Sequence, residues 1–122
     1  MDGKRKRIVI VEDEFELCSI LQDHLGKAYH ITVFNDAETC IDSISTLGNA
    51  DVIIVDYHLP QKDGFELFRA IKPQLPNAKF VFITGFLSEE KAAEGLNLGF
   101  NAILMKPFDL LALEKLIADL TS

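Results

Sequence analysis

The hydrophobic residues of this chain gather in five short strand-like runs. The runs begin at Ile8, Ile31, Val52, Phe80 and Ala102, with spacings of 23, 21, 28 and 22 residues. Four of them are unbroken, which is typical of parallel strands that are covered on both faces. Each spacing leaves room for the dozen or so residues that a parallel crossover needs. The pattern therefore predicts five parallel strands joined by helices.

The segments between the runs carry helical signals. We expect a first helix with one apolar face, formed by Phe15, Leu17, Cys18, Leu21 and Leu25. A second helix is expected to be capped by Asp36, and a third to start near Gly64 and end near Pro73. A fourth helix should start at Ser88 and a fifth near Asp109. The fourth helix is predicted to be weak, because Gly95 in its interior costs about 1 kcal/mol relative to alanine. Gly99 is expected to cap its end.

The alternation of strands and helices predicts an α/β fold with a single doubly wound five-stranded parallel sheet. We expect the flavodoxin-like strand order 2-1-3-4-5. The 122 residues, 48% of them hydrophobic, are expected to form one domain spanning 1–122, since a chain of this size buries roughly two thirds of its unfolded surface in one core. Phe86, Phe100 and Phe108 are expected to pack in the core or at its rim.

Charge and composition exclude several classes of protein. Lys and Arg number 12 against 19 Asp and Glu, a formal net charge of -7, so nucleic acid is not an expected partner. No apolar stretch approaches the roughly 20 residues that cross a bilayer, and the N-terminus lacks the apolar core of a signal peptide, so we expect a cytoplasmic protein without membrane contact. Cys18 and Cys40 lack metal-ligand spacing and fall on helices expected on opposite sheet faces, so no disulfide is expected.

Four of the predicted strands lead directly into residues with charged or polar groups. Glu12 and Asp13 follow the first run, Asp56 follows the third, Thr84 the fourth and Lys106 the fifth. Open parallel sheets bind ligands beyond the carboxyl ends of their strands, so these side chains should share one rim. In the order 2-1-3-4-5 the strand of Asp56 lies about 4.8 Å from the strand of the acidic pair and from that of Thr84.

The crowded acids predict a magnesium site. Two carboxylates 4 Å apart repel by about 4 kcal/mol at an effective dielectric constant of 20, and a hard divalent cation relieves that repulsion. We expect Asp13 and Asp56 to bind Mg²⁺ directly and Glu12 to act through water, with a backbone carbonyl just after Asp56 as a further ligand. Asp56 is also the best nucleophile candidate, since Thr84 and Lys106 can stabilise a transferred phosphoryl group.

In these residues the chain resembles the receiver domain of two-component response regulators. The resemblance covers essentially the whole chain and rests on Glu12 and Asp13, on VIIVD ending at Asp56, on LPQKDG from Leu59 to Gly64, on FITG containing Thr84 and on MKPF containing Lys106. It implies that Asp56 accepts a phosphoryl group, with Mg²⁺ held by Asp13, Asp56 and the backbone carbonyl of His58. It also implies that Thr84 and Lys106 engage the phosphoryl oxygens, and that the bond between Lys106 and Pro107 is cis.

The resemblance also sets expectations about partners and output. A sensor histidine kinase, a phosphotransfer protein or a small donor such as acetyl phosphate would supply the phosphoryl group, and an effector protein would receive the signal. The domain would not be an enzyme beyond its own Mg²⁺-dependent phosphorylation and dephosphorylation, and phosphorylation could be linked to homodimer formation through the fourth and fifth helices. Receivers commonly carry Tyr or Phe where this chain has Ile103. Output is therefore expected to rely on the Thr84 loop and the fourth helix.

Two other functions stay open from the sequence. One is a receiver-like protein-binding module that is never phosphorylated. The other is an aspartyl-phosphate phosphatase of the haloacid dehalogenase kind, which is the weaker hypothesis because such an enzyme usually has a second acid where this chain has His58. Dinucleotide binding is not expected, because EDEF places anions where a phosphate loop needs glycines and free N–H groups.

Overall fold

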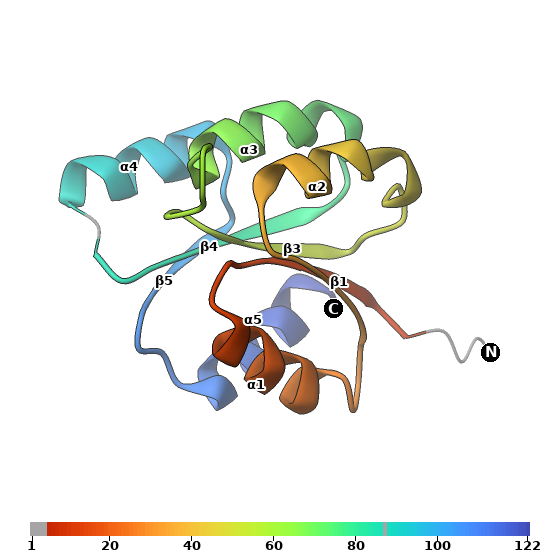
Figure 1. The fold of residues 1–122 in the computed structure, drawn as a ribbon. Coiled ribbons are helices and arrows are strands. Elements are labelled where there is room, and N and C mark those ends of the chain that lie inside the picture. The colour runs from red at the N-terminus through yellow and green to blue at the C-terminus, as the bar shows by residue number, and fades with distance from the viewer. Residues whose placement is uncertain (1–4, 87) are drawn as a thin grey trace.

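The computed structural model, which describes residues 5–86 and 88–122, has the predicted α/β architecture (Figure 1). The strands are β1 (Arg7–Val11), β2 (His30–Phe34), β3 (Val52–Asp56), β4 (Lys79–Thr84) and β5 (Ala102–Met105). The helices are α1 (Phe15–Leu25), α2 (Ala37–Asp42), α3 (Gly64–Ile71), α4 (Glu89–Leu98) and α5 (Leu110–Leu120), and short 3₁₀ turns cover Ile44–Thr46 and Lys72–Gln74. All five strands are parallel and lie in the order β2-β1-β3-β4-β5, as predicted.

Two hydrophobic layers enclose the sheet. Helices α1 and α5 cover one face, and α2, α3 and α4 cover the other (Figure 1). Along β1, Ile8 and Ile10 pack with α1 and α5, whereas Val9 and Val11 pack into the opposite layer. Burial on both faces explains why the strand sequences show little alternation of polar and apolar residues.

Helix α3 begins in close contact with the end of β3. Asp63 caps this helix, with Glu66 completing a reciprocal capping box. A Cβ atom on Gly64 would lie 2.9 Å from the carbonyl oxygen of Asp56 and 2.8 Å from the ring of Phe82. Glycine is needed there because no side chain fits between the helix and the strand.

Several local predictions are confirmed. Helix α3 ends at Ile71, just before Pro73, and Gly99 ends α4 with a φ of 123°. The bond between Lys106 and Pro107 is cis. Cys18 and Cys40 are both buried and unpaired. Apart from these predictions, none of the helices that the structure describes is long and apolar enough to cross a membrane.

Two aromatic residues are not where the sequence pattern places them. Phe15 is 72% exposed, because α1 is buried only from its second turn onward, at Cys18, Leu21 and Leu25. Phe86 is 75% exposed, so the expectation that it packs in the core or at its rim is wrong. Helical spacing predicts which residues share a face, but it does not say how far the covering layer extends along the helix.

Candidate functional site

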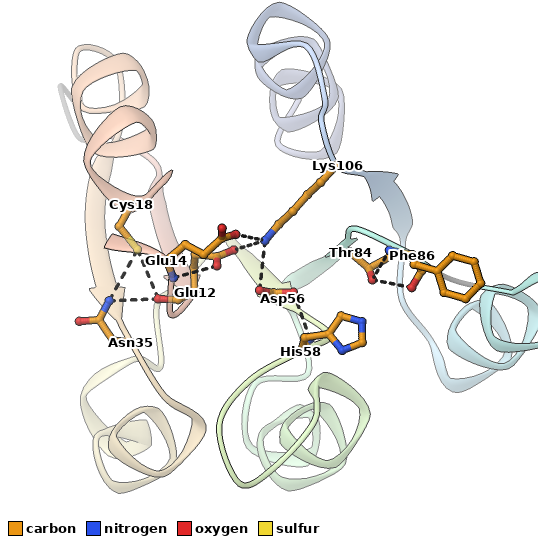
Figure 2. Close-up of polar contacts among 9 residues, drawn as sticks. All are labelled: Glu12, Glu14, Cys18, Asn35, Asp56, His58, Thr84, Phe86 and Lys106. Carbon is orange, nitrogen blue, oxygen red and sulfur yellow. Dashed lines mark hydrogen bonds and ion pairs between the residues drawn. The ribbon is translucent and has the colours of Figure 1, made fainter. Parts of the chain in front are cut away.

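Lys106 lies among three carboxylates at the carboxyl edge of the sheet (Figure 2). Its Nζ is 2.7 Å from Glu14 Oε1, 3.1 Å from Glu12 Oε1 and 3.2 Å from Asp56 Oδ2. Burial lowers the pKa of Lys106, but its hydrogen bond to Glu14 and its close contacts with the carboxylates of Glu12 and Asp56 outweigh burial and raise the pKa above its usual value. The Lys106 side chain is therefore positively charged and balances part of the negative charge of the carboxylates around it.

Glu12 is fully buried at the end of β1. Its Oε2 accepts a hydrogen bond of 3.1 Å from the backbone N–H of Glu14, while Oε1 has no hydrogen-bond partner among the described residues despite its proximity to Lys106. Burial raises the pKa of Glu12 to about 7, with a further contribution from the nearby charge of Asp56; the Glu14 N–H and Lys106 oppose this rise. A buried carboxyl oxygen without a hydrogen bond is suited to accept a ligand.

Glu12, Asp13 and Asp56 form the acidic cluster predicted from the sequence. One carboxylate oxygen from each lies within 4.8 Å of the others. An all-oxygen set with few carboxylates is the chemistry that Mg²⁺ prefers, since this ion keeps several waters and takes further ligands from a substrate phosphate. The residues present therefore fit the ion that the sequence predicts.

Asp56 is held at both of its carboxylate oxygens. Oδ1 accepts a hydrogen bond of 3.1 Å from the backbone N–H of His58, and Oδ2 accepts one of 3.2 Å from Lys106 (Figure 2). The side chain is buried, at 2% exposure. The backbone turn after β3 thus orients this carboxylate. The role of the His58 carbonyl as a metal ligand stays a prediction.

The Thr84 hydroxyl is turned toward its own loop. Thr84 Oγ1 donates to the Phe86 carbonyl at 2.9 Å and accepts from the Phe86 N–H at 3.3 Å (Figure 2). No hydrogen bond joins Thr84 to Asp56 in the part of the chain that the structure describes. The residue lies at the expected strand end, but its hydroxyl must rotate before it can serve a group on Asp56.

Two residues of this site were missed from the sequence. Glu14 makes the shortest contact with Lys106 and follows the acidic pair directly, so the third acid of EDE was the available signal. Asn35 donates from Nδ2 to the backbone oxygen of Glu12 at 3.0 Å. The sequence indicated Asn35 only as a polar residue after the second predicted strand, which lies beside the end of β1 in the sheet.

A groove of about 540 Å³ adjoins the carboxylate cluster. Its walls come from α1 and from the segment between β5 and α5, and it is lined by Glu14, Glu16, Leu17, Ile20, Lys106, Pro107, Phe108 and Leu110. Glu14 and Lys106 belong to both the groove and the cluster. A molecule bound in the groove would therefore touch the same charges that surround Asp56.

Comparison with known proteins identifies the family of the chain. The family model of the response regulator receiver domain matches residues 8–118. The transcriptional regulatory protein PcoR of Escherichia coli is 33% identical over 105 residues, which are 85% of this chain and 46% of PcoR. The response regulator receiver protein CpdR of Brucella abortus is 33% identical over 111 residues, covering 86% of this chain and 88% of CpdR.

Solved structures show the same fold. The crystal structure of a CheY-like response regulator receiver domain protein from Methanospirillum hungatei has a TM-score of 0.84 and 28% sequence identity, covering 96% of this chain and 94% of that one. The chain spans about half the length of several curated transcriptional regulators that it matches. With the family model matched over nearly its whole length, the chain belongs to the response regulator receiver domain family of two-component systems.

Proposed function

We propose that residues 1–122 form a receiver domain in which Asp56 accepts a phosphoryl group and thereby changes the binding of a partner. The supporting observation is that Asp56, a buried carboxylate of the acidic cluster, also lies 3.2 Å from the ammonium of Lys106. Such a site can bind a cation beside the acceptor oxygen and stabilise charge on the incoming group.

The proposed reaction moves one phosphoryl group. An oxygen of Asp56 attacks the phosphorus, the bond from phosphorus to the donor breaks, and the donor leaves with the electron pair of that bond. Lys106 offsets charge on the phosphoryl oxygens, and Thr84 donates to one of them after its hydroxyl leaves the Phe86 carbonyl. Asp13, Asp56 and the carbonyl of His58 would hold Mg²⁺, with Glu12 acting through water. When bound, the ion neutralises charge on the acids and on the phosphoryl group.

A phosphoryl donor and an effector are the proposed partners. The donor is a sensor histidine kinase, a phosphotransfer protein or a small acyl phosphate, and the domain acts as a signalling acceptor with no other substrate. PcoR and several other proteins similar to this chain are named as transcriptional regulators, so a regulatory effector, either attached or separate, is a reasonable recipient. Two buried, unpaired cysteines are consistent with the reducing cytoplasm, where we place the protein.

Helix α4 is the proposed output element. Gly95 is its only buried residue, and a Cβ there would lie 3.2 Å from Phe65 and 3.7 Å from Ile103. Phosphorylation adds up to about two negative charges at the rim and would draw Thr84 inward, which moves the loop before α4. We expect the rate of hydrogen exchange in Glu89–Leu98 to change when a phosphoryl mimic is bound. Any homodimer linked to phosphorylation would use α4 and α5. Unchanged exchange throughout the helix would contradict this output.

Phosphorylation of Asp56 can be tested by intact mass. Incubation with Mg²⁺ and acetyl phosphate should add about 80 Da to the wild type and nothing to Asp56→Asn. Asp63→Asn is the matched control, because it changes an acid in the same loop and asparagine still caps a helix. Failure of the wild type to gain mass at neutral pH would favour the unphosphorylated binding module.

A further inference from the structure

The backbone oxygen of Glu12 is held from the neighbouring strand and helix. Asn35 Nδ2 donates to this oxygen at 3.0 Å, and Cys18 Sγ donates to it at 3.3 Å (Figure 2). Asn35 Nδ2 also lies 3.6 Å from Cys18 Sγ. Because a carbonyl oxygen only accepts hydrogen bonds, the amide must present its NH₂ group to Glu12. These three residues form a closed set of contacts that joins the ends of β1 and β2 to α1.

Asn35 extends the strand pairing by one residue, to the point where the acidic cluster begins. The paired residues of β1 and β2 end at Val11 and Phe34, and the Glu12 N–H donates to the Phe34 carbonyl at 2.9 Å. Asn35 then satisfies the other backbone group of Glu12. That carbonyl belongs to the same peptide plane as the N–H of Asp13, so fixing it also fixes the direction in which Asp13 leaves the strand.

Asp13 depends on this support more than its neighbours do. Glu12 is buried and accepts from the Glu14 N–H, and Asp56 is held by His58 and Lys106. The side chain of Asp13, by contrast, makes no hydrogen bond with any described residue. Its position in the cluster is therefore set by the backbone on which it stands. If that backbone were free to rotate, binding a cation would have to order it first, which costs affinity.

We propose that Asn35 is a positioning residue for the acidic cluster: its amide fixes the peptide between Glu12 and Asp13 and so sets the affinity of Glu12, Asp13 and Asp56 for a divalent cation. This inference rests on the proposed function in taking Mg²⁺ as the ligand. Without the amide, the Glu12 carbonyl keeps only the thiol of Cys18, which is a weak donor. Groups that orient metal ligands in this way typically change affinity by about 10-fold to 100-fold when removed.

Titration calorimetry with Mg²⁺ alone tests the inference without requiring phosphorylation. Asn35→Ala should bind Mg²⁺ about 10-fold more weakly than the wild type. The matched control is Asn101→Ala, because Asn101 also holds a backbone group with its side-chain amide, accepting from the Phe80 N–H at 2.8 Å, but does so at the opposite end of the sheet. Each variant loses a hydrogen bond between a side-chain amide and the backbone, donated by Asn35 in one case and accepted by Asn101 in the other. Only Asn35→Ala should lose Mg²⁺ affinity.

The outcomes separate this inference from its premise. Equal Mg²⁺ affinity in Asn35→Ala and the wild type would overturn it, and so would an equal loss in Asn101→Ala, since that would reflect general destabilisation. Urea unfolding without Mg²⁺ measures how much each variant is destabilised. If Asn35→Ala does not fold, Cys18→Ala can be tested instead, because it removes the second donor to the Glu12 carbonyl and should also weaken Mg²⁺ binding. Failure of the wild type to bind Mg²⁺ would instead reject the proposed metal site.

Discussion

Glu12 should make the folded protein less stable as the pH rises from about 5 to about 7. The residue is fully buried, and its pKa is raised from 4.5 to about 7. Between these two values the folded protein keeps a proton that the unfolded chain has lost, so the free energy of unfolding falls as pH rises. At 1.36 kcal/mol per pKa unit, this rise of the pKa corresponds to about 3 kcal/mol.

Urea denaturation between pH 5 and pH 8, in the presence of a chelator, measures this effect. Glu12→Gln removes the titrating group while keeping a similar shape, so the wild type should lose most of about 3 kcal/mol relative to the variant across this range. Glu16→Gln is the control, because it removes an exposed acid from α1 without touching the cluster. Parallel stability curves for the wild type and Glu12→Gln would contradict this prediction, since titrating groups outside the cluster act equally in both proteins.

Three further substitutions test individual contacts. Glu14→Gln removes the acid nearest to Lys106 and should make its ammonium more available, raising the rate of mass gain from acetyl phosphate by up to about 5-fold, as expected for an exposed ion pair. Gln61→Gly relieves a residue with a φ of 70° and should raise the free energy of unfolding in urea by about 0.5 kcal/mol. Gly64→Ala places a Cβ 2.9 Å from the Asp56 carbonyl and should lower the same free energy by about 1 to 3 kcal/mol.

Each of these three predictions has an outcome that would contradict it. An equal rate increase in Glu16→Gln would show that the effect of Glu14 is one of overall charge and not of contact with Lys106. A loss of stability in Gln61→Gly would mean that the left-handed backbone at this position carries little strain. Unchanged stability in Gly64→Ala would mean that α3 can move away from β3 without cost.

The amino-acid pattern alone was enough to predict the fold and most of the acidic cluster. Unbroken apolar runs require cover on both faces, and connections long enough for a crossover then predict a parallel sheet. Once the strand order was predicted, Glu12, Asp13 and Asp56 had to meet, because the carboxyl ends of neighbouring parallel strands lie side by side. This information is local and repeats along the chain, so it can be read without coordinates.

The contacts between side chains at that edge, by contrast, could be identified only from the folded structure. Glu14 and Lys106 are 92 residues apart, and their contact depends on side-chain conformations on two separate elements. The Thr84 hydroxyl bonds to Phe86 because its own loop offers the nearest partners. Asn35 reaches Glu12 because β2 pairs with β1 in one particular register. Hydrophobic periodicity sets the positions of strands and helices, whereas hydrogen bonds and ion pairs depend on distances of a few tenths of an ångström that only the packed structure defines.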